Sequence, residues 1–179
     1  MPALAHTSVP AWAAPDGSSG AGATPATAPL GSSYLLVGVG GPAALVVRTW
    51  TADLAGTPDV RVLVADDAPT AQAAMTAALG RSRVGVRVWL AGPVGACLAL
   101  RGTAVCAGVE DDEMHVAPTS TGAIELFCAH CGAATTTDAG IGEVVPCGAC
   151  GRGLVIYHHV SRRTGRFLGF MVDAEEAGA

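Results

Sequence analysis

The chain has 179 residues, which is enough for one ordinary domain or two small ones. Half of its residues are hydrophobic but only 4% are aromatic, so its core must be built mainly from valine, leucine and alanine. The formal net charge is −5 and the 10 basic residues are all arginine. Such a chain is a poor electrostatic match for a phosphate backbone, so nucleic acid is not expected as a partner.

The sequence gives no sign of a membrane or export segment. No run of roughly 18 uninterrupted apolar residues occurs, so we expect no membrane span. We therefore expect a cytoplasmic protein, in which cysteines stay reduced and serve as ligands or buried thiols rather than as disulfides.

Residues 1–33 consist mainly of alanine, proline, serine, glycine and threonine. Such a segment cannot bury enough apolar surface to offset the entropy that it loses on ordering. We therefore expect a disordered tail, with order beginning near Tyr34.

From Tyr34 onwards, short apolar runs alternate with helical stretches. We expect strands at 34–39, 60–65, 84–90 and 104–109, and helices at 43–54, at 69–79 and in a short stretch that ends at Leu100. Strands that alternate with helices at this spacing predict parallel βαβ units. Residues 34–118 are thus expected to form an α/β domain, a small open parallel sheet with flanking helices.

Residues 118–122 have the composition of a linker, and the region from 119 to 179 differs from what precedes it. This region is rich in turns and contains four of the cysteines. Strands are expected at 154–160 and 167–172, and the short connection at 161–166 predicts a C-terminal β-hairpin.

The cysteines of this region form two Cys-x2-Cys pairs separated by 15 residues: Cys128, Cys131, Cys147 and Cys150. Two cysteines three positions apart on a tight turn can both reach one metal ion, and two such turns complete a tetrahedron. A glycine follows each pair, where a positive φ lets the chain turn away (Gly132 and Gly151). The pattern predicts a zinc ribbon with a structural metal, because four protein thiolates leave no coordination position open.

Iron is the alternative metal, because rubredoxins use two similar cysteine turns. Rubredoxins usually surround their metal with several aromatic residues, whereas this region offers only Phe127, Tyr157, Phe167 and Phe170.

Two cysteines stand outside the pattern in apolar surroundings, and both are expected to be buried thiols (Cys97 and Cys106).

A permissive form of the dinucleotide-binding pattern follows the first expected strand. Its small residues lie where the first strand ends and the first helix begins, and its acidic residue lies at the end of the next strand. The set comprises Gly38, Gly40, Gly41, Ala43 and Asp66. Glycines at this turn would let a pyrophosphate approach a helix N-terminus. The same small residues also permit close packing of strand and helix, so both interpretations stay open.

Polar residues are concentrated in the C-terminal hairpin: His158, His159, Ser161, Arg162, Arg163 and Arg166. On a regular strand the two histidines point to opposite faces, so only one can join a given site. A solvated hairpin is one interpretation. The other is a docking patch for an acidic or phosphate-bearing partner, with His159, Arg162 and Arg163 as the expected contacts. We identify no catalytic arrangement of residues.

The segments CAHCG and PCGACGRGLVIYHHVSRRTGRFLGFMVDAEE resemble the C-terminal domain of the DmmA-like family, a small subunit of dimethylamine monooxygenase. The cysteine turn, Gly-Arg, His-x-Ser-Arg-Arg and Leu-Gly-Phe occur in order over about residues 125–176. The resemblance implies a multi-subunit system for oxidative N-demethylation of a secondary methylamine, with haem, FMN and 2Fe-2S centres carrying electrons from NADPH to O2. It places these cofactors on partners, a haem-bearing catalytic subunit and a flavin/iron–sulfur reductase subunit.

The N-terminal half is similar to the NAD-binding lobe of ferredoxin-reductase-like flavoproteins. The Gly-Gly turn of those proteins would correspond to Gly40-Gly41, and their Cys-Gly-Pro to Ala91-Gly92-Pro93. The cysteine that approaches the nicotinamide is Ala91 here, so the lobe is expected to serve as a scaffold.

Together these resemblances predict a non-catalytic accessory subunit that assembles an oxygenase with its reductase. The alternative is an electron-transfer module, with iron at the four cysteines or a flavin on the α/β lobe. A nucleic-acid-binding zinc ribbon is a third hypothesis, which the net charge disfavours.

Overall fold

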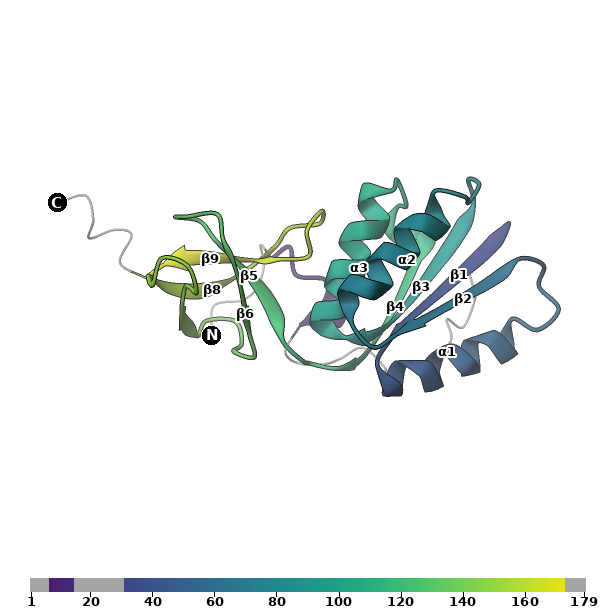
Figure 1. The fold of residues 1–179 in the computed structure, drawn as a ribbon, viewed down its shortest axis with the longest axis horizontal. Helices are drawn as coiled ribbons and strands as arrows, with labels where there is room; N and C mark the ends of the chain where they lie inside the picture. The colour runs from purple at the N-terminus through teal and green to yellow at the C-terminus, as the bar shows by residue number, and fades with distance from the viewer. Residues whose placement is uncertain (1–6, 15–30, 173–179) are drawn as a thin grey trace.

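A computed structural model describes residues 7–14 and 31–172 of the chain. Figure 1 shows two regions, a sheet flanked by helices and a smaller all-β ribbon region. The predicted fold class, α/β followed by a four-cysteine ribbon, is confirmed. In the part of the chain that the structure describes, no helix has the length and hydropathy needed to cross a membrane.

The first sheet contains four strands in the order β2-β1-β3-β4. They are β1 (Ser33–Val39), β2 (Val60–Ala65), β3 (Val86–Pro93) and β4 (Met114–Ser120). Every neighbouring pair is parallel, as strands joined by helical crossovers must be. All four strands therefore have their carboxyl ends at one edge, and beyond that edge the chain continues into the ribbon region (Figure 1).

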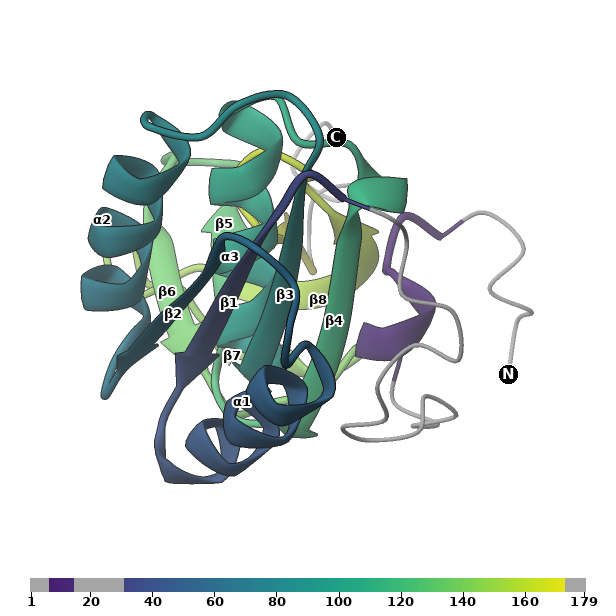
Figure 2. The ribbon, with the colours of Figure 1, turned by 90° about the vertical axis from the view of Figure 1, so that its right-hand side faces the viewer.

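Helices cover both faces of this sheet: α1 (Gly41–Asp53) covers one, and α2 (Ala68–Leu79) and α3 (Val94–Cys106) cover the other (Figure 2). Alternate residues of β1 enter the two cores: Leu35 packs with α2 and α3, and Leu36 packs with α1. Burial on both faces explains why β1 is an unbroken apolar run.

The fourth strand is not where the sequence predicts it. Residues 104–106 continue α3, a 3-10 helix η2 (Asp111–Glu113) follows, and β4 occupies part of the expected linker. Leu100 and Ala104 are both buried in one core, and their spacing of four is helical. The prediction of a strand at 104–109 is therefore wrong, and β4 extends the first sheet two residues beyond the expected boundary at 118.

The second sheet contains five strands in the order β6-β5-β9-β8-β7. They are β5 (Ile124–Cys128), β6 (Ala134–Thr137), β7 (Val144–Pro146), β8 (Gly153–Val160) and β9 (Phe167–Met171). Strands β8 and β9 form the expected antiparallel hairpin. Strand β5 pairs with β9 in parallel and with β6 in antiparallel orientation.

Residues 7–14, here called the N-terminal segment, pack against the rest of the molecule. The segment contains a 3-10 helix, η1 (Ala11–Ala13), and its residues Val9 and Ala13 are buried in the ribbon core. The Ser8 hydroxyl donates to the Val160 carbonyl at 3.1 Å and accepts from the Val160 amide at 2.8 Å. The expectation of disorder over residues 1–33 is therefore wrong for residues 7–14 and 31–33; the remainder lies outside the described residues.

The loop between β8 and β9 lies against α3. A Cβ atom added at Gly102 would come within 2.8 Å of the Arg163 carbonyl oxygen, so glycine lets helix and loop backbones touch. The Arg162 guanidinium lies 2.9 Å from a carboxylate oxygen of Asp111. The two regions therefore meet through close backbone packing and an ion pair.

Candidate metal centre

The four paired cysteines converge in the ribbon region. The Sγ atoms of Cys128, Cys131, Cys147 and Cys150 all lie within 4.8 Å of one another. Cys128 Sγ is 3.9 Å from Cys150 Sγ, and Cys131 Sγ is 3.7 Å from Cys147 Sγ. In a tetrahedron with metal–sulfur bonds of about 2.3 Å, the sulfur atoms are about 3.8 Å apart. The cluster thus has the dimensions of a four-thiolate metal site.

The two cysteine turns share one backbone geometry. In each turn the amide of the following glycine donates to the carbonyl of the first cysteine at 2.9 Å, Gly132 to Cys128 and Gly151 to Cys147. Both glycines have φ = 74°, a left-handed conformation that side-chain-bearing residues adopt only with strain. The glycines after each pair therefore have the conformational role that the sequence suggests.

The surroundings of the sulfur atoms affect them unequally. Amide hydrogen bonds from Cys150 and Ala149 stabilise the Cys147 thiolate and lower its pKa to about 6. At Cys131 the Ala133 amide also lowers the pKa, but desolvation and the other three thiols outweigh it and raise the pKa to about 12. Sulfur atoms packed this closely cannot all be negative without a cation between them. The donor set fits a thiophilic metal ion.

The two remaining cysteines differ in exposure. Cys97 is buried, its thiol donates to the Gly92 carbonyl at 3.4 Å, and burial raises its pKa to about 12. Cys106 is exposed at the end of α3. The prediction that both are buried is wrong for Cys106, because α3 extends beyond Leu100 and turns this residue away from the core.

The residues of the dinucleotide pattern divide into two groups. The Gly40 amide donates to the Ala65 carbonyl at 2.9 Å, which brings Gly40 and Gly41 beside Asp66 at the carboxyl edge of the sheet. In contrast, a Cβ atom on Gly38 would come within 3.0 Å of Val47, and Ala43 is fully buried. Gly38 and Ala43 thus serve the packing of strand against helix. Nucleotide binding at Gly40, Gly41 and Asp66 stays a prediction.

The N-terminus of α3 is covered by the chain itself. The Val94 amide donates to the Thr121 carbonyl at 3.1 Å, and a Cβ atom on Gly95 would overlap the Ala123 carbonyl. The connection between the two sheets therefore occupies a position that an anion could otherwise take. Ala91-Gly92-Pro93 ends β3 directly before this covered helix.

The histidines of β8 do not point to opposite faces. The pairing of β8 with β9 is irregular between Ile156 and Val160, and the rings of His158 and His159 lie 5.0 Å apart between centroids. Tyr157 joins them, with its ring centroid 4.2 Å from that of His158. The prediction assumed a regular strand, and a bulge-like irregularity removes the alternation on which it depended.

The hairpin arginines make contacts within the chain. Arg162 pairs with Asp111 at 2.9 Å and with Glu110 at 3.7 Å. The Arg163 carbonyl accepts a hydrogen bond from the Cys106 thiol at 3.6 Å. These contacts hold the loop against the α/β region. Binding of a partner by His159, Arg162 and Arg163 stays a prediction.

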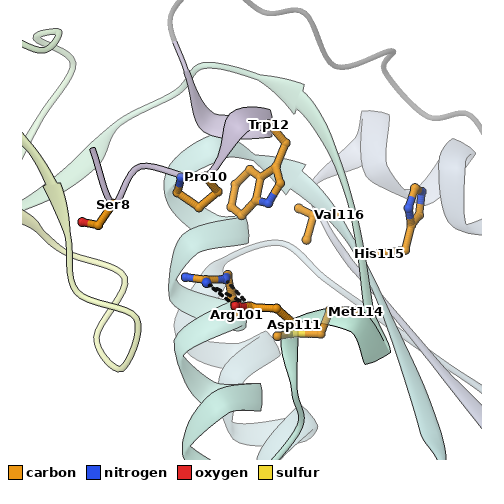
Figure 3. Close-up of a pocket in the computed structure, with 8 residues that line it drawn as sticks. All are labelled: Ser8, Pro10, Trp12, Arg101, Asp111, Met114, His115 and Val116. Carbon is orange, nitrogen blue, oxygen red and sulfur yellow. Dashed lines mark hydrogen bonds and ion pairs between the residues drawn. The ribbon is translucent and has the colours of Figure 1, made fainter. Parts of the chain in front are cut away.

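A pocket beneath the N-terminal segment was not anticipated from the sequence. It has a volume of about 440 Å³, and Figure 3 shows Pro10 and Trp12 on one side of it and the pair of Arg101 with Asp111 on the other. Two hydrogen bonds of 2.9 Å join the guanidinium to the carboxylate, although Arg101 is only 9% exposed. A lone arginine within the apolar sequence of α3 was the signal that could have indicated this buried ion pair.

The fold and the site together define the class of protein: a parallel sheet flanked by helices, followed by a ribbon in which four cysteines converge. Residues 125–170, from β5 to β9, match the family described as "Dimethylamine monooxygenase subunit DmmA-like, C-terminal domain". The chain is 31% identical over 153 residues to the "Heme-dependent oxidative N-demethylase delta subunit" of Ectopseudomonas mendocina (strain ymp), and the alignment covers 84% of this chain and 85% of that protein. The chain therefore belongs to the family of this delta subunit, and the DmmA-like resemblance is confirmed. No solved structure matches the chain significantly.

Proposed function

We propose that the chain is a non-catalytic subunit of a haem-dependent oxidative N-demethylase. The observation that carries the proposal is the 31% identity to a delta subunit over 85% of that protein's length. As its name states, that relative is one subunit of a haem-dependent enzyme. We infer that the haem resides on a separate catalytic subunit, that a reductase subunit carries FMN and a 2Fe-2S centre, and that the substrate is a secondary methylamine such as dimethylamine.

The four cysteines are proposed to hold a structural zinc ion. Their spacing, the sulfur separations of 3.7 and 3.9 Å and the repeated turn geometry support this choice. Zinc has no redox chemistry, and four thiolates leave it no open coordination position. In this role the metal would fix the five-stranded ribbon and take no part in electron transfer.

The α/β region is proposed to act as a scaffold. It has the parallel sheet of a nucleotide-binding lobe, but the Thr121 carbonyl covers the N-terminus of α3, the helix that follows the Ala91-Gly92-Pro93 turn. The ribbon also contacts α3 directly through the Arg163 loop. A scaffold of this kind would hold the haem-bearing and reductase subunits in a fixed relation.

The proposal is tested by producing a tagged form of the chain together with the other subunits. The tagged chain is expected to capture the haem-bearing subunit, and the captured complex should release formaldehyde from dimethylamine in the presence of NADPH and O2. The isolated chain should be colourless, contain one zinc ion and oxidise no amine. Amine oxidation by the isolated chain, or no capture of the haem-bearing subunit, would contradict the proposal. Iron and visible absorbance at the cysteines would favour an electron-transfer module instead.

A further inference from the structure

The ribbon sheet has a second apolar face, opposite the face that packs on the cysteine cluster. Leu126, Leu154 and Phe167 point inward and are buried. Among the residues that alternate with the inward ones and point outward, five large hydrophobic residues are between 39% and 62% exposed: Phe127, Val144, Tyr157, Phe170 and Val172. We call these five residues the outer ribbon face.

The members of the outer ribbon face form one continuous patch. Val155 of β8 pairs with Phe170 of β9 on one side and with Val144 of β7 on the other. A Cβ atom on Gly153 would lie 3.3 Å from Val172 and 3.5 Å from Val144, so these two valines adjoin above the glycine. The patch therefore extends from β7 across β8 to β9 and reaches Phe127 on β5, the strand that pairs with β9.

A face of this composition is unusual for a sheet in contact with water. A largely antiparallel sheet with one face on a core generally has polar residues on the other face. Here three of the chain's 5 phenylalanine and tyrosine residues are partly exposed on the outer face. At roughly 80 Å² for each exposed side chain, the five residues present on the order of 400 Å² of apolar surface, the size of the largest apolar patch on a typical monomer, which is often a functional surface.

We propose that the outer ribbon face is the surface through which this chain binds the haem-bearing subunit of the demethylase. The inference rests on the proposed function, which supplies the partner. The five residues are all uncharged, and the neighbouring Glu125 is paired with Arg166 at 2.7 Å, so the partner must offer a largely apolar patch of similar size. Four of the five lie within the segment 125–170 that matches the DmmA-like family.

The area also fits a complex between different subunits. Because interfaces are about 60% apolar, a 400 Å² patch corresponds to about 700 Å² per partner, close to the roughly 800 Å² of a standard heterocomplex. Obligate homodimers bury at least about 1,000 Å² on each partner, so the face is too small for one. The charged loop residue Arg162, in contrast, is already paired within the chain.

The test uses the complete complex and the substitution Phe170→Glu. Its matched control is Val62→Glu, because Val62 on β2 is also 45% exposed but lies on the other sheet. A charge at the centre of an apolar interface should reduce the haem captured by the tagged chain about tenfold or more. The control should capture haem as the wild type does, and both variants should keep their metal. Tyr157→Ser, a milder change on the same face, should reduce capture by a smaller factor.

Three results would overturn the inference. Unchanged haem capture by both Phe170→Glu and Tyr157→Ser would exclude the face while leaving the proposed function intact. A dimer of the isolated wild-type chain that Phe170→Glu dissociates would assign the face to a second copy of the chain. Failure of the wild-type chain to capture the haem-bearing subunit would remove the proposed function and this inference together.

Discussion

The two sheets of the molecule are each stabilised in a different way. The first has helices of its own chain on both faces; its central strand β1 is buried throughout, and the neighbouring central strand β3 is buried except at Arg87 and Pro93. The second has one face on the cysteine cluster, α3 and the N-terminal segment, while its other face is largely exposed. A sheet this small with a single covered face buries little apolar surface. We therefore expect the first region to depend mainly on buried area, and the second to depend also on the metal ligation that we propose for its four cysteines.

The strongest test of this difference is the substitution Cys128→Ser. With a ligand lost, the ribbon should unfold, because metal binding and folding of such modules are coupled with apparent energies of about 10 kcal/mol or more. The α/β region should remain largely folded, since its two cores contain none of the four cysteines. Hydrogen exchange measured residue by residue should show loss of protection in β5 to β9 and retention in β1 to β4.

Cys106→Ser is the matched control, because Cys106 is an exposed thiol outside the cluster. It should keep both the metal content and the exchange pattern of the wild type. Equal loss of protection in both sheets of Cys128→Ser would show that the two regions fold as a single cooperative unit.

Features governed by local pattern were predicted well. The strand at 60–65 lies at the predicted residues, and the cysteine pairs converge as their spacing and glycines indicate. In both cases the signal depends on residues close together in the chain. The strand at 114–120 was missed because its sequence, MHVAPTS, has weak alternation and contains a proline. An edge position tolerates that proline, and only the sheet order shows that β4 is at an edge.

Features governed by distant contacts were not predictable. The average composition of residues 1–33 indicates a tail, whereas Val9 and Ala13 are buried by a ribbon more than a hundred residues away. Similarly, no local signal indicates the irregularity that brings His158 beside His159. Long-range packing decides both outcomes, and periodicity contains no information about it.

An intermediate effect is expected from Trp12→Ala in the N-terminal segment. Trp12 is partly buried against the ribbon core, so its removal should lower the free energy of unfolding by roughly 1–2 kcal/mol. Urea denaturation measures the change. Leu45→Ala is the control, because Leu45 is 56% exposed and should change stability by less than about 0.5 kcal/mol. Equal changes in the free energy of unfolding for Trp12→Ala and Leu45→Ala would show that the Trp12 side chain adds nothing to stability.

The smallest effect on stability is expected where the two regions meet, at Arg162 and Arg163. The pair of Arg162 with Asp111 is half exposed, with side-chain exposures of 50% and 48%, and such pairs contribute about 0–1 kcal/mol. The double change Arg162→Ala and Arg163→Ala should therefore leave metal content and fold intact.

The same double variant decides between two candidate docking surfaces. If the outer ribbon face binds the haem-bearing subunit, the double variant should capture nearly as much haem as the wild type, because the loop faces the chain's own α3. Capture reduced as strongly as by Phe170→Glu would instead make the hairpin loop a docking contact, as its concentration of arginine suggests. Haem absorbance of the captured complex, normalised to the amount of tagged chain, measures both variants on one scale. Because Arg162 binds Asp111 and Phe170 lies on the outward face of β9, the two changes act on different surfaces and their effects should add if both surfaces contribute.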